Sequence, residues 1–192
     1  MTQIEKPRCP WCLGDPLYMA YHDKEWGRPL HNNRRLFELL VLEGAQAGLS
    51  WLTILKRREA YRAAFDGMDP EKIAGYGEHD IRRLMGDQRI IRNRRKIVSA
   101  IENARAYLAM MDGPRSFSAW LWDHVDGEPL INHFSSMSQI PASTPLSEGI
   151  SKELKEKGFS FVGPTIMYAF LQSAGLVNDH LTSCYLRQTE ER

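Results

Sequence analysis

The stretch NRRKIVSAIENARAYLAMM, residues 93–111, decides the fold class of this chain. Its apolar residues recur at steps of three and four, at Ile97, Ala100, Ile101, Ala104 and Leu108. Such steps place side chains on one face of an α-helix, because the helix turns by about 100° per residue. The pattern therefore predicts one long amphipathic helix over residues 93–111.

Helical patterns of the same kind precede this stretch. A helix is predicted over residues 33–48, because apolar residues recur at helical spacing and Gly48 is a typical C-terminal stop. Ser50 is placed to cap a second helix, which the sequence predicts over residues 51–65. The two helices would be joined by a short turn.

The remaining elements are also mostly helical. Asp69 followed by Pro70 is typical of the first turn of a helix, here a short one. Further helices are predicted over residues 79–85, 116–125, 146–158 and 165–175, with a turn or two over 177–186. Residues 131–145 form a predicted loop, and only residues 159–163, FSFVG, alternate as a strand does. The expected fold class is all-α.

Composition limits the class of protein further. The chain has 192 residues with 43% hydrophobic and 26% charged residues, which is typical of a globular domain. No apolar run approaches the roughly 18 residues that a membrane helix needs, and the N-terminal sequence lacks the apolar region of a signal peptide. We expect a single unit over residues 1–192 that is cytoplasmic, monomeric and not bound to membranes.

Cationic residues are clustered although the net charge is only +1. One cluster comprises Arg89, Arg92, Arg94, Arg95 and Lys96. A second comprises Lys56, Arg57, Arg58 and Arg62. Such clusters can face an anion even when acids elsewhere cancel their charge. On charge alone, a solvated helix face is the more frequent explanation.

Cysteine and histidine residues near both ends of the chain suggest a metal site. His180 and Cys184 are four residues apart, so on a helix they would project from one face. Zinc binds four such ligands in a tetrahedron. Either Cys9 with Cys12, or Cys9 with His22, could complete the set. Zinc bound in this way would join the two ends of the chain.

Two other interpretations of the cysteines are weaker. The total of three is odd, which argues against a framework of disulfides. CPWC, residues 9–12, resembles the CxxC motif of thioredoxin-like redox sites. That motif lies between a strand and a helix, and no strand pattern surrounds residues 9–12, so we disfavour a redox site.

A carboxylate occupies the apolar face of the predicted helix 33–48. Glu43 lies three residues after Leu40 and four before Ala47. A buried carboxylate is costly unless it is paired, hydrogen-bonded or needed for function. The sequence leaves two explanations open, a buried structural salt bridge or a cavity that begins at this point. Trp51 would lie close to the same region.

The motifs together resemble the bacterial 3-methyladenine DNA glycosylase I family. The segments that carry the resemblance are RCPW, DPLYMAYHDKEWG, LFELLVLEGAQAGLSWLTILKRREAYRAAF, IIRNRRKIVSAIENARAYL and FVGPTIMYAFLQSAGLVNDH, with the closing His180 and Cys184. The match runs from Arg8 to Cys184. The resemblance implies a helix-hairpin-helix DNA glycosylase-like fold whose terminal segments, about 1–30 and 175–192, are joined by a structural Zn²⁺. The implied ligands are Cys9, His22, His180 and Cys184.

The resemblance also implies an activity, the hydrolytic release of a flipped-out 3-methyladenine from alkylated double-stranded DNA, without a lyase step. Glu43 matches the acidic residue of the family's base pocket, and Tyr21 and Trp51 match its walls. Two more aromatic residues near the same site are Tyr18 and Trp11. The resemblance places Gly48 and Leu49 beside the flipped nucleotide. It also implies that residues 88–93, with the cations Arg92 and Arg94, bind DNA phosphates.

One residue departs from the family pattern. Arg89 stands where family members have a glycine at the turn of the hairpin. Glycine allows a left-handed backbone and close approach of amides to a phosphate. An arginine either strains this turn or replaces the amide contacts with a charged side chain. The departure keeps a second hypothesis open, a zinc-stapled protein that binds DNA or modified bases without catalysis.

Overall fold

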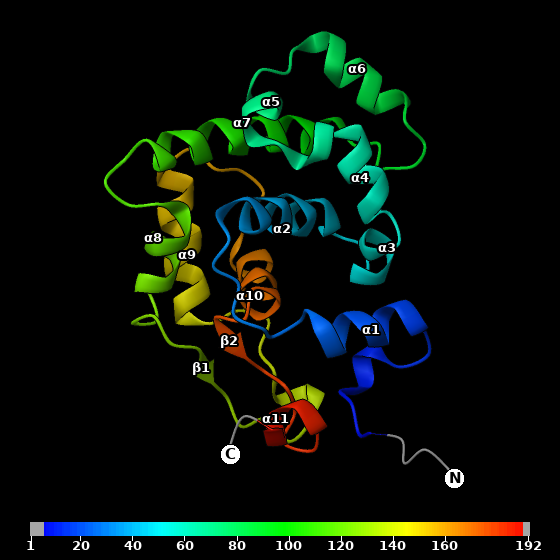
Figure 1. Ribbon diagram of the computed structural model, residues 1–192, viewed down its shortest axis with the longest axis vertical. Helices are drawn as coiled ribbons and strands as arrows, with labels where there is room; N and C mark the ends of the chain where they lie inside the picture. Colours follow the sequence, from blue (N-terminus) through cyan, green and yellow to red (C-terminus); the bar gives the residue numbers. More distant parts are fainter. Residues whose placement is uncertain (1–5, 190–192) are drawn as a thin grey trace.

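Helix α2, Asn33–Gln46, lies at the centre of the fold, between α7, Arg94–Met111, and α10, Pro164–Ser173 (Figure 1). The computed structural model describes residues 6–189. The outermost parts of the predicted terminal segments 1–30 and 175–192 therefore lie outside the described residues. No helix within 6–189 is long and apolar enough to cross a membrane.

The other elements surround these three helices. They are α1 Pro16–Lys24, α3 Trp51–Leu55, α4 Arg58–Ala64, α5 Pro70–Ala74, α6 Glu78–Gly86, α8 Phe117–Asp123, α9 Pro145–Glu156 and α11 Tyr185–Thr189. Short 3₁₀ turns are η1 Pro10–Cys12, η2 Asp66–Met68 and η3 Met137–Gln139. Strands β1 Leu130–Ile131 and β2 Val177–Asn178 form one short parallel pair. The all-α prediction is confirmed.

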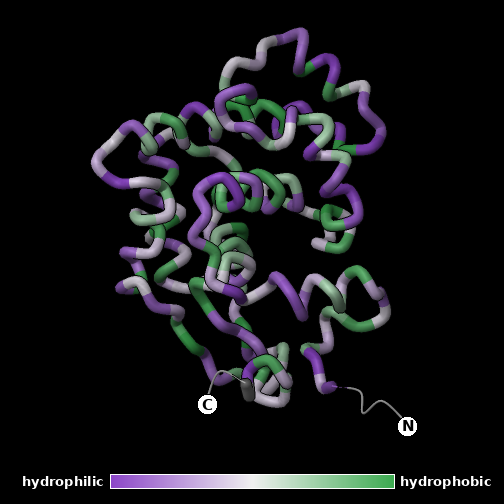
Figure 2. Tube along the Cα trace, viewed as in Figure 1, coloured by the Kyte–Doolittle hydropathy of each residue, from purple (hydrophilic) through white to green (hydrophobic). Residues whose placement is uncertain are grey.

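The core forms around α2 because its apolar face is buried on both sides. Leu36, Phe37 and Leu40 have almost no exposed surface. Figure 2 shows α2 changing from a hydrophilic first turn to a largely hydrophobic body where it faces its neighbours. Asn32 caps its N-terminus by accepting from the Arg35 N–H. The same burial covers the later turn that carries Glu43.

Helices α6 and α7 and the connection 87–93 form a hairpin beside the C-terminal end of α2. Asn93 caps α7 by accepting from the Arg95 and Lys96 N–H groups. The Lys96 ammonium donates to the carbonyls of Ala45 and Ala47, at 2.8 and 2.6 Å. These bonds satisfy carbonyls at the end of α2 and fix the start of α7 against it.

Two local predictions were wrong because a tertiary contact replaced the expected local pattern, and one helix was missed. The helix predicted over residues 51–65 is two helices, and the break turns Arg58 toward the end of α1. Residues 159–163 form no strand, because the Ser160 backbone bonds the Asn103 side chain. Helix α1 itself was not predicted, since its charged and aromatic residues show no apolar stripe.

The segment 180–184 is also not helical, contrary to expectation. The Leu181 N–H donates to the Cys9 sulfur, and the Thr182 N–H donates to the Phe134 carbonyl. These bonds direct the amides away from a helical ladder. The Tyr185 N–H also donates to the Pro7 carbonyl, which joins the two ends of the described chain.

Candidate functional site: an aromatic pocket and a Cys/His cluster

Glu43 lies in the core without an ion-pair partner among residues 6–189. Its side chain is buried, with 2% of the residue exposed. The Ser173 hydroxyl donates to Oε1 at 2.8 Å, whereas Oε2 has no hydrogen-bond partner among the described residues. Burial raises the pKa of Glu43 to about 8. Of the two explanations left open, the structure supports the cavity and excludes the salt bridge.

Five aromatic side chains line the cavity next to Glu43, and we call it the aromatic pocket. Tyr21 and Trp51 form one wall with ring centroids 5.6 Å apart, and Trp11 and Tyr18 form another with centroids 4.8 Å apart. All five residues that were predicted for a base pocket therefore line one cavity. The structure thus brings these five residues together at one site.

Several polar atoms in this pocket lack partners. The Tyr21 hydroxyl and the Trp51 indole N–H are buried without a hydrogen bond among the described residues, as is Glu43 Oε2. Buried polar groups are normally paired, so three such atoms around one cavity indicate that it is built to contact a polar ligand. Burial also raises the pKa of Tyr21 well above its ordinary value, which keeps its hydroxyl protonated.

Sequence reasoning missed seven residues that also line the aromatic pocket. They are Trp26, Gln46, Met137, Ile140, Ala169, Gln172 and Ser173. Ser173 is the direct partner of Glu43 although 130 positions separate them. No local pattern points to Ser173, since its role depends on the packing of α10 against α2. Trp26 carried a signal, because it belongs to the same aromatic run as Tyr21.

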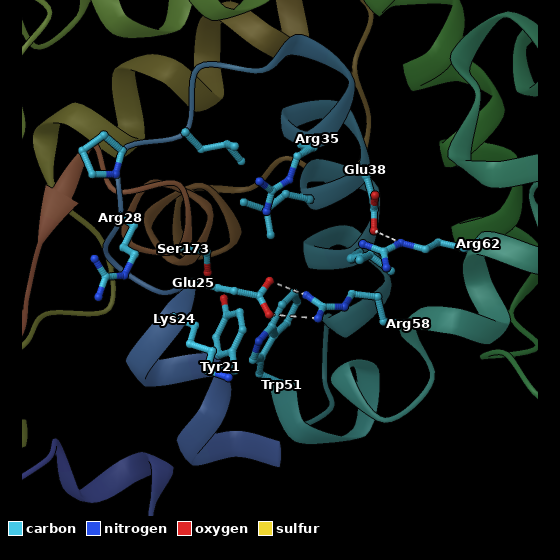
Figure 3. Close-up of a pocket in the computed structure, with 14 residues that line it drawn as sticks. Tyr21, Lys24, Glu25, Arg28, Arg35, Glu38, Trp51, Arg58, Arg62 and Ser173 are labelled. Carbon is cyan, nitrogen blue, oxygen red and sulfur yellow. Dashed lines mark hydrogen bonds and ion pairs between the residues drawn. The ribbon is translucent and has the colours of Figure 1, made fainter. Parts of the chain in front are cut away.

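A second cavity, the rear cavity, shares Tyr21, Trp51 and Ser173 with the aromatic pocket. Figure 3 shows Glu25 and Arg58 paired beside the two rings. Arg58 donates two bonds to the Glu25 carboxylate, at 2.6 and 2.9 Å. Glu25 directly follows α1, which carries Tyr21, and Arg58 begins α4, which follows the α3 helix of Trp51, so the ion pair ties α4 to the end of α1.

The four predicted zinc ligands lie close together, next to α1, which carries His22. The ligand atoms of Cys9, His22, His180 and Cys184 lie within 4.8 Å of one another, and all four residues are buried. The sulfur–nitrogen separations are 3.7 Å for Cys9–His180, 3.5 Å for Cys184–His22 and 3.6 Å for Cys184–His180. A tetrahedral zinc ion with ordinary bond lengths requires about 3.6 Å. The geometry of this Cys/His cluster therefore fits zinc.

Cys12 is not part of this group. Its thiol donates to the Cys9 carbonyl at 3.2 Å instead. All three cysteines are free thiols, so no Cys9–Cys12 disulfide is present. Among the alternatives that the sequence left open, the geometry favours His22 over Cys12 as the fourth ligand.

Asp23 orients the His22 ring. His22 Nδ1 lies 2.9 Å from Asp23 Oδ1, which leaves Nε2 to face Cys184. Arg8 donates three bonds to the same carboxylate, at 2.9, 3.1 and 2.8 Å. Burial alone would raise the pKa of Asp23, but the bonds from Arg8 and His22 lower it to about 2. Asp23 therefore has a structural role, which is to hold the His22 ring in place.

The two clusters of cations differ in how far they are neutralised. In the second cluster, Lys56 pairs with Asp15, Arg58 with Glu25, and Arg62 with Glu38 and Glu59. It is therefore mostly a set of structural ion pairs, as the solvated-face explanation predicts. The first cluster keeps Arg92 and Arg95 outside any ion pair among the described residues.

At the hairpin turn, Arg89 has no left-handed backbone. Its guanidinium bonds the Asp87 carboxylate at 2.9 and 2.8 Å. The turn is therefore not strained at this position. This excludes the first of the two alternatives, that an arginine in place of the family's glycine strains the turn. Gly48, by contrast, does adopt a left-handed φ of 78° and leaves the following Leu49 41% exposed. This exposed leucine lies between α2 and α3, two residues before Trp51 of the aromatic pocket.

The fold and the pocket together define a class of α-helical protein in which a central helix carries a buried carboxyl into an aromatic pocket. One solved 3-methyladenine DNA glycosylase I superposes with a TM-score of 0.91 at 53% identity, covering 93% of this chain and 98% of that one. A tyrosine-to-phenylalanine variant of a 3-methyladenine DNA glycosylase I, solved in complex with 3-methyladenine, superposes with a TM-score of 0.90 at 40% identity. The match covers 94% of this chain and 97% of that one.

Sequence comparison gives the same result. The chain is 51% identical over 177 residues to DNA-3-methyladenine glycosylase 1 of Escherichia coli strain K12, covering 92% of this chain and 95% of that protein. The family description that matches residues 11–188 is methyladenine glycosylase. This protein belongs to the methyladenine glycosylase family.

Proposed function

We propose that the protein releases 3-methyladenine from alkylated double-stranded DNA by hydrolysis of the bond between base and sugar. The observation that carries the proposal is Glu43, a buried carboxyl without an ion pair at the end of an aromatic pocket. Relatives named for this activity, and one solved in complex with 3-methyladenine, support it. The three atoms without partners around the pocket match a planar ligand with polar edges.

Departure of the methylated base needs little acid catalysis from the protein. Methylation at N3 gives adenine a positive charge, so the base accepts the electron pair of its bond to the sugar and leaves as a neutral molecule. Water adds to the anomeric carbon and releases a proton. The protein must therefore extrude the nucleotide, select the cationic base and exclude normal ones.

Tyr21, Trp51 and Glu43 are suited to this selection. The π faces of Tyr21 and Trp51 attract a cation, and the Glu43 carboxylate accepts from the amino edge of the base. Because burial holds Glu43 largely protonated at neutral pH, a cationic base that lowers the pKa of Glu43 gains the charge interaction, whereas a neutral adenine does not.

The same lining argues for a monofunctional enzyme. No lysine is among the described residues that line the aromatic pocket. A lyase step through a Schiff base needs such an amine next to the sugar. We therefore propose that the product is an abasic strand that stays uncut.

For DNA binding, we propose that the hairpin holds phosphates through Arg92 and Arg94, and that Leu49 fills the stack left by the flipped base. Both arginines lie at the hairpin turn and the start of α7, beside the end of α2. Cationic contacts to phosphates add affinity without reading sequence. An exposed leucine at a left-handed glycine is placed as an apolar wedge.

For the Cys/His cluster, we propose a structural zinc that joins residue Cys9 and α1 to the C-terminal segment. Its fit rests on the buried donor set and the separations near 3.6 Å. His22 and Tyr21 are neighbours on α1, so a fixed His22 also holds the pocket wall. We further propose one monomeric unit in the cytoplasm, where cysteines that form no disulfide stay reduced.

A base-release assay tests this proposal. Alkylated DNA is incubated with the protein, and the released bases are identified by chromatography against 3-methyladenine. Release by the wild type, with strong loss in the Glu43→Ala, Trp51→Ala double variant, is expected. DNA binding without any base release would support the non-catalytic alternative instead.

A further inference from the structure

Phe161 has a backbone conformation that aromatic residues rarely adopt, with a φ of 54°. Among the described residues, the other non-glycine positions with positive φ are Asp66, Met68 and Asp126. Aspartates tolerate this region, and Met68 is held by complete burial in the core. Phe161 has neither reason, since it is only partly buried. Strain of this kind often marks a functional contact.

The strained conformation is held in place by α7. Asn103, which is buried, accepts from the Ser160 N–H at 2.8 Å and donates to the Ser160 carbonyl at 3.0 Å. Both halves of one side-chain amide therefore fix one residue of the loop. Phe159 and Val162 on either side are buried in the core, whereas Phe161 is not part of the core clusters. The loop is built to keep the Phe161 ring out of the core.

The ring lies between the pocket helix and the hairpin helix. Gly44 directly follows Glu43 on α2, and a side chain there would meet the Phe161 Cβ at 3.5 Å. On the other side, the Arg95 guanidinium lies over the ring, 5.9 Å from its centroid. Phe161 and Arg95 line a shallow surface depression together with Arg94. An apolar ring and cations thus form one surface next to the proposed phosphate site.

Positive and negative charges lie at opposite ends of this depression. Arg95 forms no ion pair within residues 6–189, and Arg94 pairs only with the exposed Glu78. The acid of the depression is Glu102, which accepts from the Ser160 hydroxyl at 2.9 Å. Glu102 lies two turns along α7 from the two arginines, so the positive end of the depression is the one nearest the hairpin turn.

We propose that Phe161 and Arg95 form a further contact to duplex DNA, in which Arg95 binds a backbone phosphate and the Phe161 ring packs against the adjoining deoxyribose. The inference rests on the proposed function and adds a contact between its two parts, the pocket and the hairpin. A contact to phosphate and sugar carries no base information, so we expect it to give affinity and register without lesion preference.

Replacing Phe161 by glycine separates this role from a structural one. Phe161→Gly removes the ring and relieves the strained φ, so we expect a melting temperature equal to or above that of the wild type. Affinity for an undamaged duplex should fall about three- to tenfold, as expected for loss of one apolar contact. KM for alkylated DNA should rise by the same factor, with kcat and binding of free 3-methyladenine unchanged.

Two further variants serve as partner and control. Arg95→Gln should lower the slope of log affinity against log salt by about 0.9, the value for one phosphate. Asp126→Gly also replaces a residue of positive φ by glycine, but at an exposed site after α8. It should therefore leave DNA affinity unchanged. Wild-type affinity in Phe161→Gly, or a joint loss of stability and affinity, would overturn the proposal. Duplex binding without base release by the wild type would instead refute the proposed function alone.

Discussion

Replacing Glu43 by glutamine should make the protein more stable at high pH while weakening its hold on a cationic base. The variant keeps the shape of the side chain and can still accept from Ser173. It removes the only group of the aromatic pocket whose pKa burial raises to about 8. Stability and recognition should therefore change in opposite directions, which a simple loss of packing would not produce.

The sign follows from proton binding. Between pH 4.5 and about 8 the folded state holds the Glu43 proton and the unfolded state does not. The folded state binds more protons in this interval, so wild-type stability falls as pH rises through it. At about 1.4 kcal/mol per pH unit, the interval gives an upper bound of about 5 kcal/mol. Glutamine does not titrate, so the variant lacks this decline.

Urea unfolding of both proteins at pH 5, 6, 7 and 8 measures this difference. The Cys/His cluster is common to both, so any metal loss at low pH cancels in the comparison. The stability gap should widen in favour of glutamine with each pH unit. Affinity for alkylated DNA should fall about 10- to 150-fold, the value of one charged hydrogen bond. A gap that does not change with pH would refute the reasoning about Glu43.

Three further predictions concern zinc, the pocket wall and the hairpin. Cys184→Ala should lose bound zinc and several kcal/mol of stability, whereas Cys12→Ser should keep about one zinc per chain by atomic absorption. Arg58→Ala should raise KM for alkylated DNA and lower the free energy of unfolding by about 1 kcal/mol, because α4 loses its ion pair with Glu25 at the end of α1. Arg62→Ala, at another arginine of the same rear cavity, should leave KM unchanged. Arg92→Ala should lower DNA affinity and its salt dependence together, as titrations at several salt concentrations would show.

The sequence predicted those parts of the structure that depend on local periodicity. Apolar spacing over residues 93–111 predicted α7, and the position of Glu43 within an apolar stripe predicted an unusual carboxylate. The family resemblance named His22 in place of Cys12, and the geometry of the cluster agrees. Each of these signals lies within one segment or in the identity of single residues.

The remaining features depend on contacts between distant segments. Ser173 reaches Glu43 only because α10 packs on α2, and no pattern near Ser173 encodes this. The break within residues 51–65 follows from the pairing of Arg58 with Glu25. The coil at His180 arises because the neighbouring Leu181 N–H bonds Cys9 of the N-terminal segment and the Thr182 N–H bonds Phe134. Periodicity cannot show such contacts, because their partners lie elsewhere in the chain.

The most direct test of the central claim is the identity of the base that the protein releases. Alkylated duplex DNA, treated with the wild type, should yield free 3-methyladenine and leave an abasic strand without a break. The Glu43→Ala, Trp51→Ala double variant should yield little or none. Absence of free 3-methyladenine with the wild type, or undiminished release by the double variant, would contradict the account.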